Sequence, residues 1–316
     1  MNKIYSLLGK IIISFFRIFN IKKKFITSLN FNIGLNSLLC NRNLYDNGKS
    51  INEFELKINS QNGEDGIIDF LLTKLKILKP NFVEIGVGEY IEANTRFLYD
   101  RYHSRGLIID CIDNFKKKAS SNVNLWKGDL NIVEQKIKPE NVKQVLNENC
   151  NFDIDLFSID IDGVDYWVIE KLDPKISKLF IAEYNSVFGH NYDISVPNIE
   201  NFERYSYHYS GLCYGMSLKA LIRLMREKGF YFIGTNNFKN NAFFVNNDFP
   251  LNVSFKGFQA IDDFKLESFT NSTFTESRDT KGKLNYLRRK KILEEIQDCE
   301  IVDFSDNSKL KKIKDI

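Results

Sequence analysis

Segments typical of buried strands alternate with amphipathic, helix-like segments along most of this 316-residue chain. Strands that alternate with helices form a mostly parallel sheet covered on both faces. The last two strand-like segments are joined by a turn too short for a crossover helix, so they should pair antiparallel. The predicted fold is therefore α/β and doubly wound, with a mostly parallel seven-stranded sheet and a terminal antiparallel hairpin. The strands are expected at residues 81–88, 105–113, 122–130, 152–163, 177–186, 230–237 and 241–248.

Composition narrows the function classes. Hydrophobic residues make up 43% of the chain, enough for a substantial core, and the net charge of +3 argues against nucleic acid as a partner. The five cysteines are scattered without a CxxC pair, as in a chain whose thiols stay reduced in the cytoplasm. No two of the three histidines are spaced for one helix face, so no histidine-built metal site is predicted.

The first 25 residues predict a basic amphipathic helix. Lys3, Lys10, Arg17 and Lys24 recur every seven residues and fall on one helix face, with apolar residues opposite. Interior charges interrupt the apolar run, so a transmembrane span is not expected. Two interpretations stay open: a helix lying on an anionic membrane surface, which we favour slightly, or a helix docked on the protein itself.

The first expected strand ends in a glycine turn of the sequence Glu84-Ile-Gly86-Val-Gly88. In a doubly wound sheet, ligands bind at the carboxyl ends of the strands. Asp110 is expected to end the second strand and Asp129 the third. Glu84, Asp110 and Asp129 are therefore predicted to meet the ammonium, ribose and adenine groups of S-adenosylmethionine (SAM). Each acid alone would be an ordinary strand-end carboxylate, whereas the three in this order favour a SAM site.

Four stretches resemble the FkbM-like group of SAM-dependent methyltransferases: FVEIGVGEY, DLFSIDIDGVDYWVIEKL, FIAEYNSVFG and residues 216–245. The resemblance covers residues 58–248 and implies a Rossmann-like methyltransferase that methylates a hydroxyl of a sugar or glycan-related molecule in surface-polysaccharide assembly. Gln61, in an upstream element similar to one in the family, and Asn94 complete the predicted cofactor-binding residues. The chain departs from the family at Asp162, where a glutamate is usual.

The predicted organisation has three parts. Residues 1–50 hold the basic helix and a linker, residues 51–251 form the methyltransferase domain, and residues 252–316 form a polar loop and a charged helical extension. Such an enzyme is expected in the cytoplasm, on the inner face of the membrane if the basic helix binds lipid. Its oligomeric state is not legible from the sequence.

Catalytic residues are expected after the fourth and fifth strands. A sugar hydroxyl is a poor nucleophile and benefits from a general base. Asp160 and Asp162 are the first candidates, and His190, in a long aromatic loop at residues 186–215, is the third. That loop is predicted to cover the pocket as a lid. The predicted substrate-binding residues are Glu183, Asn185, Tyr192 and His208.

Three other interpretations remain. Asp160 and Asp162 could hold Mn²⁺ and a nucleotide sugar in a glycosyltransferase, because hard cations prefer carboxylate oxygen. The chain could also be a non-catalytic, membrane-attached binding module that keeps the fold. An NAD-dependent oxidoreductase is less favoured, because Ile91 stands where a dinucleotide-binding turn needs a third glycine.

Overall fold

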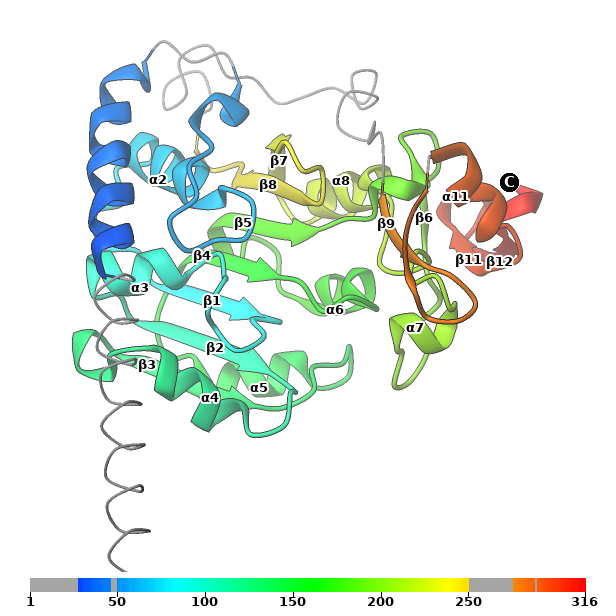
Figure 1. Ribbon diagram of the computed structural model, residues 1–316, viewed down its shortest axis with the longest axis horizontal. Coiled ribbons are helices and arrows are strands. Elements are labelled where there is room, and N and C mark those ends of the chain that lie inside the picture. The colour runs from blue at the N-terminus through cyan, green and yellow to red at the C-terminus, as the bar shows by residue number, and fades with distance from the viewer. Residues whose placement is uncertain (1–27, 47–49, 250–274, 288) are drawn as a thin grey trace, which may run out of the picture.

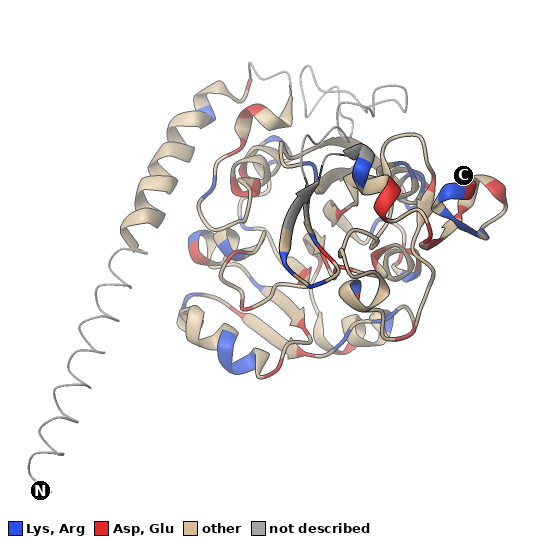
Figure 2. Ribbon diagram, turned by 45° about the vertical axis from the view of Figure 1, so that its right-hand side comes forward, with Lys and Arg blue, Asp and Glu red and all other residues tan. Residues whose placement is uncertain are grey.

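The structure, a computed structural model, describes residues 28–46, 50–249, 275–287 and 289–316 (Figure 1). The predicted basic helix at residues 1–25 lies outside these residues, as do residues 252–274 of the predicted C-terminal part. Within the described residues, no helix is both long and apolar enough to span a membrane. Basic and acidic residues are interspersed along the described ribbon (Figure 2).

A seven-stranded sheet in the order β3-β2-β1-β4-β5-β8-β7 forms the centre of the molecule. The first five of these strands run parallel, and β8 lies antiparallel between β5 and β7. The predicted doubly wound, mostly parallel seven-stranded sheet with a terminal antiparallel hairpin is confirmed. The strands are β1 (Phe82–Ile85), β2 (Gly106–Asp110), β3 (Leu130–Glu134), β4 (Ile154–Ile159), β5 (Ser177–Glu183), β7 (Phe230–Thr235) and β8 (Asn241–Asn246).

Helices cover both faces because successive strand residues point to opposite sides. Val83 of β1 belongs to the core under one set of helices, and its neighbour Phe82 belongs to the core under the other. The first face is covered by α5 (Val142–Asn149), α6 (Asp165–Lys171) and α8 (Leu218–Glu227). The second is covered by α2 (Glu64–Lys74), α3 (Arg96–Tyr102) and α4 (Phe115–Asn122).

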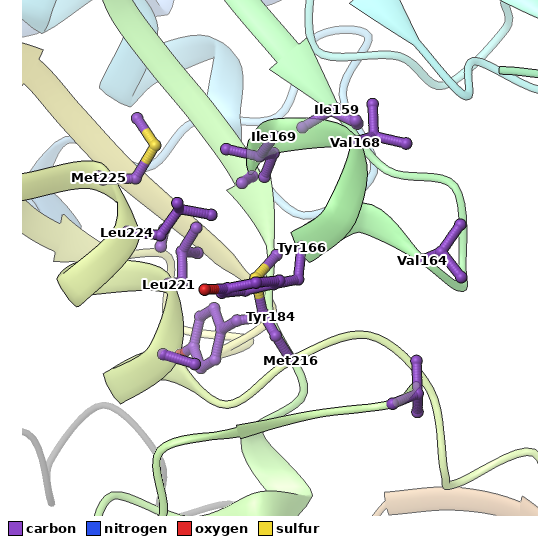
Figure 3. Packing of buried hydrophobic residues seen from close by; sticks show 14 of the residues in the cluster. Ile159, Val164, Tyr166, Val168, Ile169, Tyr184, Met216, Leu221, Leu224 and Met225 are labelled. Carbon is purple, nitrogen blue, oxygen red and sulfur yellow. The ribbon is translucent and has the colours of Figure 1, made fainter. Parts of the chain in front are cut away.

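Side chains of α6 and α8 belong to the same part of the first core (Figure 3). Leu221 and Leu224 of α8 lie near Ile169 of α6 and Tyr184, which directly follows β5 (Figure 3). All four side chains are at most 3% exposed. This packing fixes the β4–α6 and β5 junctions, where the candidate catalytic residues lie.

The N-terminal part adds a further helix at residues 28–41 in place of the expected linker. It packs against the body through Phe31, whose ring lies 6.2 Å from that of Phe97, and through the buried Leu38.

The third strand was predicted in the wrong place. Leu125 and Trp126 suggested a strand, but they lie in a 3-10 helix, η3 (Leu125–Lys127), and Trp126 is 81% exposed. The strand begins only at Leu130. It is the edge strand of the sheet, only half-buried, so its own apolar pattern is weak.

From Thr275 onward, the C-terminal part forms strands as well as the expected helix. Its first described segments are the strands β9 (Thr275–Arg278) and β10 (Leu284–Leu287), and the expected charged helix follows them as α11 (Arg289–Glu295). Next come β11 (Glu300–Asp303) and β12 (Lys309–Lys312), and β11 pairs with β6 (Ile194–Ser195) of the predicted lid. Ile292 and Ile296 are fully buried in the first core, so this part packs onto the body.

Candidate functional site

A cavity of about 910 Å³ opens at the carboxyl ends of β1, β2 and β4. These strands point toward the side of the molecule that carries α7 (Arg204–Tyr207) and the C-terminal segments (Figure 1). The other walls are the loop after β3, at residues 135–140, and residues 198–205 of the predicted lid. The volume is in the range of small-molecule and cofactor sites, roughly 300–1,000 Å³.

The glycine turn after β1 forms one wall, and its first glycine is required by close packing. Gly86 has a φ of +81°, and a Cβ there would lie 1.6 Å from the carbonyl oxygen of Asp160. Gly88 has a φ of +55°, but a Cβ there would meet no atom within 4 Å. The turn thus brings the ends of β1 and β4 together and leaves open space above Gly88.

Asp110 lies at the end of β2 and lines the cavity, as predicted. Its Oδ2 accepts hydrogen bonds from the backbone N–H groups of Val87 (2.8 Å) and Gly88 (2.7 Å). Its Oδ1 accepts one from Ile112 (3.0 Å). Asp110 therefore fixes the glycine turn while presenting carboxylate oxygen to the cavity.

Glu84 does not line the cavity. Its side chain is buried and accepts hydrogen bonds from the backbone N–H groups of Asn94 and Thr95 and from the Thr95 hydroxyl. Burial raises the pKa of Glu84 to about 7, against these three donors. Glu84 holds the segment before α3 from behind the site, so the expected convergence of three acids on one hollow is wrong for this residue.

Asp129 lies just before the amino end of β3, whereas the cavity opens at the carboxyl ends of the strands. It precedes β3 rather than ending it, its side chain is 69% exposed, and it pairs with Arg105 at 2.8 Å. The prediction that it reaches the adenine is wrong, because it depended on the misplaced third strand. The acid that ends β3 is Glu134, and the residues that follow it line the cavity.

Gln61 and Asn94 also lie away from the cavity walls. Gln61 is exposed, in the loop that leads into α2. The Asn94 side chain is buried and donates from Nδ2 to the Ser158 hydroxyl at 3.1 Å. Asn94 is thus occupied by a hydrogen bond within the protein, whereas Gln61 is exposed. The binding of either residue to a cofactor stays a prediction.

Three carboxylates gather where β4 and β5 end. Asp160, Asp162 and Glu183 each offer an oxygen within 4.8 Å of the others, and Asp160 and Asp162 line the cavity. This spacing would let one divalent cation bridge them. Burial, and next the charge of Asp162, raises the pKa of Asp160 to about 8. Burial and the charge of Asp160 also raise the pKa of Glu183, so both carboxyl groups hold their protons more tightly than free carboxyl groups do.

A cation from the predicted lid faces this group. Nη1 of Arg204 donates to Oδ1 of Asp162 at 2.6 Å, and its Nε donates to the carbonyl of Gly211. The guanidinium lies 3.8 Å from the ring centre of Tyr214, whose hydroxyl donates to Glu183 at 3.4 Å. One chain of contacts therefore joins Asp162 to Glu183 through Arg204 and Tyr214.

The other predicted lid and substrate residues do not line the cavity. Asn185 is buried and donates from Nδ2 to the carbonyls of Leu212 and Tyr214. His208 contacts the Ser210 hydroxyl at 2.7 Å, and burial lowers its pKa. Tyr192 packs against the first core. His190 is half-buried, and its Nδ1 has no hydrogen-bond partner among the described residues.

Sequence reasoning missed the residues of two cavity walls. Lys136 and Lys138, in the loop after β3, form ion pairs with Glu203 (3.4 Å) and Glu200 (3.0 Å) across the mouth. Correct placement of the third strand would have pointed to this loop. Arg204 and Tyr205 were hidden in a loop rich in aromatic residues, where no spacing distinguishes a wall residue from a packed one.

No protein-family model matches the chain, and no curated protein matches it in sequence. Similar solved structures include an S-adenosylmethionine-dependent methyltransferase from Clostridium acetobutylicum ATCC 824, with 11% identity, a TM-score of 0.38 and coverage of 57% of this chain and 88% of that one. Human N-acetylserotonin methyltransferase in complex with SAM is similar at 12% identity and a TM-score of 0.33, over 56% of this chain and 50% of that one.

A third similar structure is the pyocyanin biosynthetic protein PhzM, with 14% identity, a TM-score of 0.33 and coverage of 55% of this chain. The present chain spans about half of its length, 53%. At such identities and TM-scores, what these proteins bind or methylate does not transfer to this chain.

Proposed function

We propose that the protein is a SAM-dependent O-methyltransferase that methylates a hydroxyl of a sugar or glycan-related small molecule in surface-polysaccharide assembly. The observation that supports this most is the turn from Gly86 to Gly88, which Asp110 fixes at the mouth of a cofactor-sized cavity. In doubly wound sheets this is the position where nucleotide-like ligands bind.

The cavity residues fit an adenosyl cofactor. Gly88 leaves open space for close approach, and the carboxylate of Asp110 can accept from the ribose hydroxyls. The loop at residues 135–140 offers apolar Ile137 and Pro139 as surfaces for a base. SAM, when bound, supplies an electrophilic methyl group to the acceptor oxygen.

The carboxylates at the end of β4 provide the proton chemistry. A hydroxyl that attacks a methyl group must lose its proton, and a base is most effective when its pKa lies near the working pH. Asp160 has a pKa of about 8 and lines the cavity, so it is suited to accept this proton. Asp162, fixed by Arg204, is suited to hold the acceptor by its other hydroxyls.

The far wall supports a sugar-like acceptor. Tyr205 lines the cavity and is 52% exposed, so its ring offers an apolar face next to charged and hydrogen-bonding groups. A sugar ring presents an apolar face and several hydroxyls, and so matches a wall of this kind.

Two measurements test this proposal. The melting temperature should rise with S-adenosylhomocysteine, and any rise caused by a nucleotide sugar should not depend on Mn²⁺. Incubation with methyl-labelled SAM and a panel of monosaccharides and nucleotide sugars should transfer label to at least one of them. Label transferred only to amine or carbon acceptors would contradict O-methylation, even if the cofactor binds.

A metal-dependent glycosyltransferase is the second candidate, favoured by the spacing of Asp160, Asp162 and Glu183. It predicts the reverse thermal result, in which stabilisation requires a UDP-sugar together with Mn²⁺. The glycine turn held by Asp110 has no role in that reaction, so we place this candidate second.

We also propose that the enzyme works in the cytoplasm, at an anionic membrane surface bound through residues 1–25. The support is the heptad spacing of Lys3, Lys10, Arg17 and Lys24. The full chain should co-sediment with phosphatidylglycerol vesicles, and a chain that begins at residue 26 should not. Equal sedimentation of the two would rule out this role.

A further inference from the structure

The acid cluster at the end of β4 and β5 needs a counter-charge, because carboxylates this close repel one another. Among the described residues, Asp162 is ion-paired with Arg204 at 2.6 Å, and neither Asp160 nor Glu183 has an ion pair of its own. Lys136 and Lys138 line the same cavity but pair with glutamates at its mouth. Arg204 is therefore the cation that this part of the chain supplies to the cluster.

Arg204 is held as a fixed group. Its side chain is 23% exposed, its Nε donates to the Gly211 carbonyl, and its guanidinium lies 3.8 Å from the ring centre of Tyr214. A guanidinium placed over an aromatic ring while it donates to a carboxylate is restricted in position and direction. Nη1 thus holds the Asp162 carboxylate at the cavity wall.

The C-terminal part holds the short helix that carries Arg204. The Tyr207 hydroxyl, at the other end of α7, donates to the carbonyl of Glu300 at 2.6 Å. The Arg278 backbone N–H donates to the carbonyl of Ser210 at 3.1 Å, and the Arg278 guanidinium lies 5.7 Å from the ring centre of Tyr205. β11 also pairs with β6 at the base of the same loop.

We propose that Arg204 is a positioning residue that takes the place of a divalent cation at the Asp160–Asp162–Glu183 cluster and holds Asp162 for the acceptor. The C-terminal part of the chain sets its position. This inference rests on the proposed methyltransferase function and adds that the reaction needs no metal. It also gives the C-terminal part a role, which is to support the cavity wall at residues 198–205 where the acceptor is expected to bind.

Binding of Mn²⁺, followed by electron paramagnetic resonance, tests this proposal without an identified acceptor. In the presence of S-adenosylhomocysteine, the wild-type protein should leave Mn²⁺ free at about 0.1 mM. Arg204→Met removes the charge and keeps the length, and should tighten Mn²⁺ binding by about tenfold or more, roughly 1.4 kcal/mol. Arg204→Lys keeps the charge and should behave like the wild type.

The matched control is Arg278→Met, which removes a guanidinium that has no carboxylate partner among the described residues, and it should not change Mn²⁺ binding. The affinity for S-adenosylhomocysteine should stay within about twofold of the wild-type value in all three variants. If the wild type itself does not bind S-adenosylhomocysteine, the proposed function is refuted rather than the role of Arg204. Micromolar Mn²⁺ binding by the wild type, or equal binding by Arg204→Met and the wild type, would overturn the role of Arg204.

If Arg204→Met fails to fold, Asp162→Asn provides the second test. Loss of the acid should leave Arg204 with one carboxylate fewer, and Mn²⁺ should then bind no better than in the wild type. Tighter Mn²⁺ binding by Asp162→Asn would also overturn the proposal.

Discussion

At the scale of single residues, Gly86 and Asp110 define the site more strictly than any charge pattern. Only glycine fits at position 86, because a Cβ there would collide with the carbonyl oxygen of Asp160. The Asp110 side chain is held by hydrogen bonds from three backbone N–H groups. Both were predicted from the sequence, because a strand followed by a glycine turn and a strand followed by an acid are local signals. Glu84 was not placed correctly, because nothing local shows that Asn94 and Thr95 fold back onto it.

Gly86→Ala should be much more damaging than Gly88→Ala. The first places Cβ 1.6 Å from a backbone oxygen, which must move, at a cost of about 3 kcal/mol or more of unfolding free energy. The second meets no atom within 4 Å and carries only left-handed strain, about 1–2 kcal/mol. Urea unfolding of both variants checks this, and equal losses would show that the close approach of Gly86 to Asp160 is not present.

The raised pKa of Asp160 predicts how the free energy of unfolding depends on pH. Burial raises the folded-state pKa of Asp160 from 3.8 to about 8, so the folded protein binds a proton that the unfolded chain releases. The stabilisation of the folded state by this proton is complete below pH 3.8 and is lost as the pH rises through about 8.

Glu183→Gln should flatten that dependence by at least about half, because an amide can donate to Asp160 without a titrating proton. Urea unfolding of the two proteins from pH 5 to 9 measures the difference. Parallel pH curves would show that Glu183 does not contribute to this pH dependence.

At the scale of elements, prediction worked where a strand or helix is buried and failed where it is not. Buried β1, β4 and β5 were placed from their apolar runs, whereas half-buried β3 was displaced toward Leu125 and Trp126. The misplacement removed the loop at residues 135–140 from the predicted site. Periodicity reports burial, so it is least informative at a sheet edge.

The C-terminal segments illustrate the same limit. A charged helix was expected in this part and is present as α11, but pairing of β11 with β6 joins residues about 100 positions apart. Such pairing is set by the whole fold and leaves no local signal.

Ile296→Ala tests whether the C-terminal part is integral to the body. Ile296 is 0% exposed within the first core, so truncation should cost about 2–5 kcal/mol of unfolding free energy. The control Leu310→Ala lies in the same part but is 56% exposed, and should cost no more than about 0.5 kcal/mol. Similar small effects of both changes, or a separate transition for the C-terminal part, would show that it folds independently.

At the scale of the whole molecule, topology brings together residues that the sequence separates. The sheet order places the ends of β1, β2 and β4 around one cavity, and the lid adds Arg204 from outside the sheet. The fold class followed from the alternation of strands and helices. The acceptor wall did not, because it depends on how a long loop lies across the strand ends.

Calorimetric titration of S-adenosylhomocysteine into the wild type, Asp110→Asn and Asp129→Asn tests the central claim most directly. The account predicts one site in the wild type, binding weakened about tenfold or more by Asp110→Asn, and binding unchanged by Asp129→Asn, whose residue lies before the amino end of β3 and away from the cavity. Absence of heat in the wild type at about 1 mM ligand, or equal weakening by the two changes, would contradict it.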